Sequence, residues 1–126
     1  MLFWILVGLA VYVVNVFLPA TLYLPREGLI AHLGSRDNLP DADALTGRAR
    51  RSLANMQESL PIFLALALLA MIVPDADMAQ AVLGAQIWVI ARVVYMVMYL
   101  ISITGLRSAV WTVGVIGNII QVMALI

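Results

Sequence analysis

The chain contains no cysteine and no lysine, only one histidine, and few charged residues of either sign. Without cysteine it can form no disulfide, no thiolate metal site and no cysteine nucleophile, and the single His32 gives no basis for a histidine metal site. Charged residues make up 11% of the 126 residues, against about 25% in an average soluble domain. The formal charges sum to zero and no basic tract occurs, which argues against nucleic acid as a partner. A chain so poor in charge cannot cover a water-facing surface.

What fills the sequence instead is apolar. Hydrophobic residues account for 64% of it, and the mean hydropathy is +1.05. Four apolar stretches, separated by polar connections, each approach the roughly 20 residues that a helix needs to cross a bilayer. The sequence therefore predicts an all-α integral membrane protein, a single domain built as an up-down four-helix bundle. The helices are expected at about residues 2–25, 48–73, 78–103 and 106–126, with a polar loop at 26–47.

The arginines are distributed unevenly among the connections. The loop at 26–47 and the connection between the third and fourth helices carry arginines, whereas the connection at 74–77 carries only aspartates. By the positive-inside rule the arginine-rich loops face the cytoplasm. Both ends of the chain are then expected on the opposite side of the membrane.

Three of the expected helices carry polar side chains at intervals of three and four residues, which places them on one face of each helix. All of them lie toward the arginine-rich side. They are Arg48, Arg51, Asn55 and Glu58 in the second helix, Arg92, Tyr95 and Tyr99 in the third, and Arg107, Ser108 and Trp111 at the start of the fourth.

A charged side chain at the centre of a spanning helix costs at least about 2.5 kcal/mol, so Glu58 and Arg92 are expected to face the interior of the bundle. One interpretation is that these two residues pair and lock the second helix to the third. A single glutamate cannot neutralise the arginines of all three stripes, so the surplus positive charge calls for an anion. Lipid phosphate, bulk counterions and a specific ligand all remain open.

A small ligand with several carboxylates, one amine and one thiol matches this set of side chains. Arginines bind carboxylates in bidentate fashion, and a glutamate can accept from an amine. A cation at the start of a helix favours the thiolate form of a thiol. Glutathione has this combination of groups.

The polar residues also form motifs that resemble those of the MAPEG family, the membrane-associated proteins in eicosanoid and glutathione metabolism. Three such motifs occur in the same order as in the family, and the similarity extends over nearly the whole chain. They are Arg51-x3-Asn55-x2-Glu58-x2-Pro61, Arg92-x2-Tyr95-x3-Tyr99 and Leu106-Arg107-Ser108.

The resemblance implies a bacterial-type member, placed in a bacterial inner membrane and assembled as a homotrimer with glutathione bound between subunits. The implied activity is that of a transferase or peroxidase, which uses a glutathione thiolate on lipophilic electrophiles or on lipid hydroperoxides from the bilayer. Arg107, with Ser108 beside it, is implied to be catalytic. The residues implied to bind glutathione are Arg48, Arg51, Asn55, Glu58, Arg92, Tyr95, Tyr99 and Trp111.

Two other functions remain open from the sequence. One is a non-catalytic lipid-binding or scaffolding protein that keeps the family fold. The other is a small transporter or channel, which the apolar far halves of all four helices argue against. Trp111 stands where a prostaglandin synthase of the family has tyrosine, and an indole is bulkier and lacks a hydroxyl.

Overall fold

The computed structural model describes residues 1–33 and 43–126, except for the side chains of residues 26, 27, 29–33 and 104. Much of the loop expected at 26–47 lies outside these residues, as do all of Arg36 and the side chains of Arg26 and His32. The described chain forms four helices: α1 (Leu2–Leu33), α2 (Ala44–Ile72), α3 (Met78–Leu100) and α4 (Thr104–Met123). Each is long and apolar enough to cross a membrane. The predicted four-helix membrane fold is confirmed.

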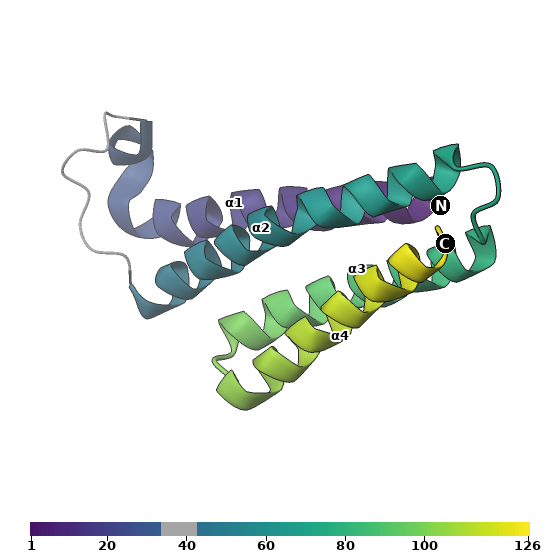
Figure 1. Ribbon diagram of the computed structural model, residues 1–126. Helices are drawn as coiled ribbons and strands as arrows, with labels where there is room; N and C mark the ends of the chain where they lie inside the picture. The colour runs from purple at the N-terminus through teal and green to yellow at the C-terminus, as the bar shows by residue number, and fades with distance from the viewer. Residues whose placement is uncertain (34–42) are drawn as a thin grey trace.

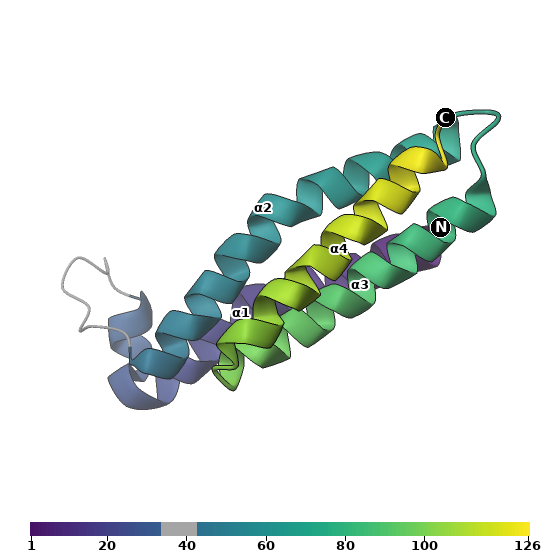
Figure 2. The same cartoon turned by 60° about the horizontal axis from the view of Figure 1, so that its bottom comes forward.

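The helices run up and down as two adjacent pairs. Figure 1 shows α1 beside α2 and α3 beside α4, with α2 and α3 joined by a short turn. Both chain ends lie near that turn, and the connection between α3 and α4 lies at the opposite end of the bundle (Figure 2). Contacts between α2 and α3, between α1 and α3, and between α2 and α4 join the two pairs, while the described residues of α1 and α4 make no contact with each other.

The helix ends follow local chemistry. The carboxylate of Asp43 accepts hydrogen bonds from the backbone nitrogens of Leu45 (3.3 Å) and Thr46 (3.1 Å), so α2 begins at Ala44, before the position near residue 48 expected from the sequence. In α1 the apolar span ends at Pro25. The helical segment continues to Leu33 across a break at Gly28, whose φ of 78° is a conformation that favours glycine.

The core combines a ring stack with close backbone contact. Phe63 of α2 stacks on Trp88 of α3, with ring centroids 4.0 Å apart. One turn before Trp88 in α3, Gly84 faces Gly117 of α4, and a methyl group on Gly117 would come within 2.7 Å of the Gly84 carbonyl oxygen. Helices α3 and α4 can therefore pack this closely only because both positions lack a side chain.

A buried polar contact joins the remaining helices. Asn15 of α1 accepts a hydrogen bond from the Ser52 hydroxyl of α2 at 3.0 Å and donates to the Met96 sulfur of α3 at 3.3 Å. Such bonds across membrane helices contribute about 0.6 kcal/mol on average. Together with the glycine contact, this network fixes how the helices are rotated about their axes, and that rotation sets which side chains meet at the site.

Candidate functional site: a polar pocket between α2, α3 and α4

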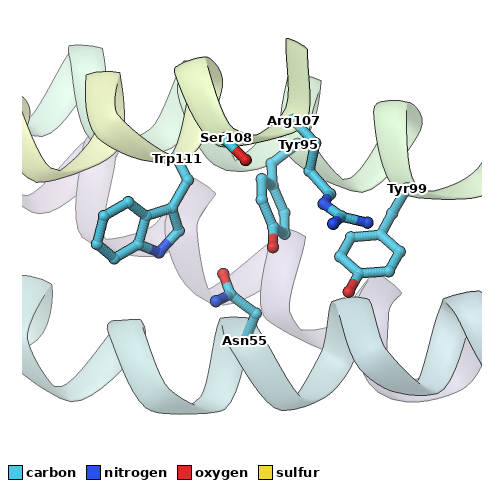
Figure 3. A pocket seen from close by; sticks show the side chains of 6 residues that line it. All are labelled: Asn55, Tyr95, Tyr99, Arg107, Ser108 and Trp111. Atoms are coloured by element: carbon cyan, nitrogen blue, oxygen red, sulfur yellow. The ribbon is translucent and has the colours of Figure 1, made fainter. Parts of the chain in front are cut away.

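A pocket of about 250 Å³ lies between three helices, in the half of the bundle farthest from the chain ends. Figure 3 shows side chains from α2 below and from α3 and α4 above directed into it. The residues that line it are Asn55, Tyr95, Tyr99, Arg107, Ser108 and Trp111. Each of them belongs to the polar stripes identified in the sequence, so the structure brings part of all three stripes to one place.

Arg107 lies in the first turn of α4 with its guanidinium over the ring of Tyr99, 4.5 Å from the ring centroid. Tyr99 in turn meets Tyr95 edge to face, with the ring centroids 5.4 Å apart. The first turn of α4 contains no acidic residue, and its N-cap, Ile103, makes no side-chain capping bond. The cation and the positive end of the helix dipole therefore act on the pocket with the same sign.

Arg92 lies behind the pocket and not in its lining. Its side chain is buried, with 3% of its surface exposed. Its Nη1 donates to Asn55 Oδ1 at 2.8 Å, and its guanidinium carbon lies 5.3 Å from the Trp88 ring centroid and 5.7 Å from that of Tyr95. Arg92 thus reaches the pocket only through Asn55 and Tyr95, which line it.

The expected pairing of Arg92 with Glu58 is wrong for the described residues, since Glu58 is exposed and forms no ion pair with any of them. The reason is the rotation of α2. Its buried stripe includes Ser52, Met56 and Leu60, and Glu58 follows Met56 by two residues, which turns it out of this stripe. Asn55, one turn earlier, is in position to accept from Arg92.

The two arginines of the α2 stripe also lie outside the pocket lining. The Nε of Arg48 donates to the carbonyl oxygen of Leu100 at 3.2 Å, where it binds the C-terminal end of α3. Arg51 is exposed and, like Glu58, has no hydrogen bond or ion pair with another described residue. Within a single chain, Arg51 and Glu58 are therefore available to a ligand or a partner.

The lining defines the chemistry that the pocket can serve. No carboxylate of the described residues lines it, and it offers one guanidinium, one amide, one indole N–H and three hydroxyls, all able to donate. Among the side chains that the structure describes, no group of three or more acidic, histidine or cysteine residues could hold a metal ion. A donor-rich, cationic pocket of this kind fits an anion.

One element of the site is not apparent in the sequence motifs. A methyl group on Gly114 of α4 would come within 2.8 Å of Arg92 Nη2, so this glycine makes room for the buried guanidinium. The signal available in the sequence is a glycine on the helix that must pass a large buried cation, but one sequence does not reveal which glycine this is.

Comparison with models of protein families gives a match. The family model described as MAPEG family matches residues 1–126, which is the whole chain. No curated protein matches it.

Proposed function

Because the chain belongs to the MAPEG family, we propose that its pocket binds glutathione and that the protein is a membrane-bound glutathione transferase or peroxidase. Its second substrate is a lipophilic electrophile or a lipid hydroperoxide that arrives from the bilayer. The observation that carries the proposal is the pocket itself, in which donor side chains from three helices surround Arg107 without any carboxylate among them. Membership of the family points to glutathione-related or eicosanoid metabolism, and the donor set favours the glutathione branch.

The residues present fit the groups of glutathione. Arg107 and the Asn55 amide can donate to a carboxylate oxygen or to a thiolate sulfur. The exposed Arg51 suits a second carboxylate. Glu58, exposed three residues after Asn55, suits the amine. When bound, glutathione supplies a thiol whose deprotonated form is the nucleophile.

Arg107 is the residue proposed to control that proton. Its charge and the N-terminal end of α4 both lower the pKa of a nearby thiol, because both favour the anion. The hydroxyl of Ser108 and the indole N–H of Trp111 line the same pocket and can donate to a negative charge there. The ring of Tyr99 holds Arg107 in place, and Tyr95 packs edge to face against Tyr99.

The site is proposed to be completed by a neighbouring copy in a homotrimer. A pocket of about 250 Å³ is smaller than the roughly 300–1,000 Å³ typical of pockets that enclose a drug-sized ligand, so one chain covers only part of a tripeptide. Arg51 and Glu58 are charged, exposed and placed on a membrane helix. Covering them with a second subunit removes their contact with lipid and places them around the same ligand.

The proposed orientation puts the pocket on the cytoplasmic side. The pocket lies at the end of the bundle that holds the α3–α4 connection, and Arg48, Arg50 and Arg51 lie at the start of α2. The positive-inside rule then directs this end to the cytoplasm, which is where glutathione is reduced and abundant. The lipophilic substrate is proposed to enter from the lipid side.

The deciding experiment measures the glutathione thiolate by ultraviolet difference absorbance in purified protein near neutral pH. We expect a thiolate signal for the wild type, and we expect Arg107→Ala to lose it because the cation that favours the anion is gone. Arg50→Ala is the matched control: Arg50 is exposed, lies over Tyr23 and does not line the pocket, so its signal should equal that of the wild type.

Two results would contradict the proposal in different ways. A thiolate signal that persists in Arg107→Ala would assign thiol activation to another group. No binding of glutathione by the wild type would leave a family fold without the chemistry, and a lipid-binding or scaffolding role would take its place.

A further inference from the structure

We propose that Arg92 is a positioning residue that holds the Asn55 amide by its oxygen, so that the amide nitrogen is presented to the ligand. This inference rests on the proposed function for the identity of the ligand. It moves Arg92 from direct contact with glutathione, as the sequence motifs imply, to a role one residue removed from it.

The direction of the amide follows from the chemistry of the two side chains. A guanidinium has five N–H donors and no acceptor, so the contact of 2.8 Å between Arg92 Nη1 and Asn55 must involve the amide oxygen. The Nδ2 group of Asn55 then points to a different side. It donates to no other described residue, and Asn55 lines the pocket. Both of its hydrogens are therefore available to an acceptor on a ligand.

The guanidinium itself is fixed on several sides. Trp88 and Tyr95 hold it through their rings. It also lies so close to Gly114 that a methyl group there would come within 2.8 Å of Arg92 Nη2. No carboxylate of the described residues pairs with it, and its Nε has no hydrogen-bond partner. The cation thus has the Asn55 oxygen as its one hydrogen-bonded partner within the described chain.

A buried cation on one end of an amide strengthens the other end as a donor. Hydrogen bonds in a chain polarise one another in a medium of low dielectric, so the positive charge of Arg92 makes the Nδ2 hydrogens of Asn55 more acidic in character. A bound carboxylate or thiolate gains from this arrangement without touching Arg92. Asn55 and Arg92 together act as one extended cationic donor.

The test compares glutathione affinity and thermal stability in detergent for Arg92→Met, Asn55→Leu and the double variant. Arg92→Met should weaken binding by about tenfold, which is the loss expected for one hydrogen bond to a charged group. It should not lower the melting temperature, because it removes a buried charge that has no counterion. In the Asn55→Leu background the same change should weaken binding no further, since Arg92 acts through Asn55.

Arg92→Lys is the conservative rescue, because an ammonium can still donate to the Asn55 oxygen. It should bind glutathione closer to the wild type than Arg92→Met does. Gly114→Ala displaces the guanidinium with a methyl group and removes no polar group. It should therefore also weaken glutathione binding. Gly105→Ala on the same helix, where a methyl group meets open space, should bind as the wild type does.

Two outcomes would overturn the inference. One is wild-type affinity in Arg92→Met. The other is full additivity of Arg92→Met with Asn55→Leu, which would mean that Arg92 contacts the ligand directly.

Failure of the proposed function gives a different result. If the wild type does not bind glutathione, melting temperatures alone test the Arg92–Asn55 contact. Asn55→Asp places a carboxylate against the guanidinium, so it should raise the melting temperature of the protein that has Arg92. The same change should not raise the melting temperature of Arg92→Met. The absence of an Arg92-dependent rise would overturn the contact itself.

Discussion

Arg107 is the residue on which the proposed chemistry depends, and Tyr99 determines how it is presented. The ring lies against one face of the guanidinium at 4.5 Å, in the arrangement of a cation–π contact. Stacking occupies a face and leaves the N–H groups at the edge free. A planar cation held in this way can bind an anion at its edge without first losing side-chain freedom.

The stack gives a prediction for Tyr99. Tyr99→Phe keeps the ring and should retain most of the thiolate signal, whereas Tyr99→Leu removes the ring and should reduce the signal severalfold, since a partly desolvated cation–π contact contributes about 0.5–2 kcal/mol. The measurement is the pH at which bound glutathione ionises, taken from ultraviolet absorbance. Equal losses in both variants would show that the Tyr99 hydroxyl, and not its ring, is what the site needs.

At the scale of elements, the contact between α3 and α4 places two sides of the pocket. Gly84 and Gly117 bring the two backbones together, and the pocket residues of α3 and α4 lie farther along the same pair of helices, toward their connection. The distance between Tyr99 and Arg107 thus depends on a packing contact several turns away.

Gly117→Ala tests that contact. Its methyl group would lie 2.7 Å from the Gly84 oxygen and 2.8 Å from the Trp88 nitrogen, both backbone atoms that cannot yield easily. We expect a loss of about 1–3 kcal/mol in the free energy of unfolding, as for other overpacked positions. Thermal unfolding in detergent measures it, with Gly105→Ala as the control. A melting temperature equal to that of the control would mean that the helices separate without cost.

At the scale of the whole molecule, the four spans and the gathering of polar side chains on three helix faces could be predicted from the sequence. Which of these side chains line the pocket, and which partners the buried charges have, could not. Apolar runs of sufficient length and polar residues at helical spacing determine which residues share a face. They do not determine how far α2 is rotated relative to α3. That rotation directs Asn55 and not Glu58 toward Arg92, and it depends on packing contacts such as Phe63 on Trp88.

The homotrimer is a prediction at this same scale. Native mass spectrometry of the detergent-solubilised protein should give three times the chain mass of 13.7 kDa. Arg51→Ala should then weaken glutathione binding by more than tenfold, since Arg51 is proposed to hold a carboxylate in a desolvated interface. If the protein is a monomer, binds glutathione and is still weakened more than tenfold by Arg51→Ala, the whole site lies within one chain.

Helix α1 takes part in the bundle in a different way from the other three. Among the described residues it touches α2 and α3 but not α4, and none of its side chains lines the pocket. Its contribution is the Asn15 contact, the packing of Ile5 and Gly8 against the core around Phe63, and an apolar surface. Selection on the site therefore acts on this helix only through its packing contacts. In related sequences we expect its positions other than Asn15 and Gly8 to vary among apolar residues, so distant relatives are better recognised by the residues of α2, α3 and α4 than by their first span.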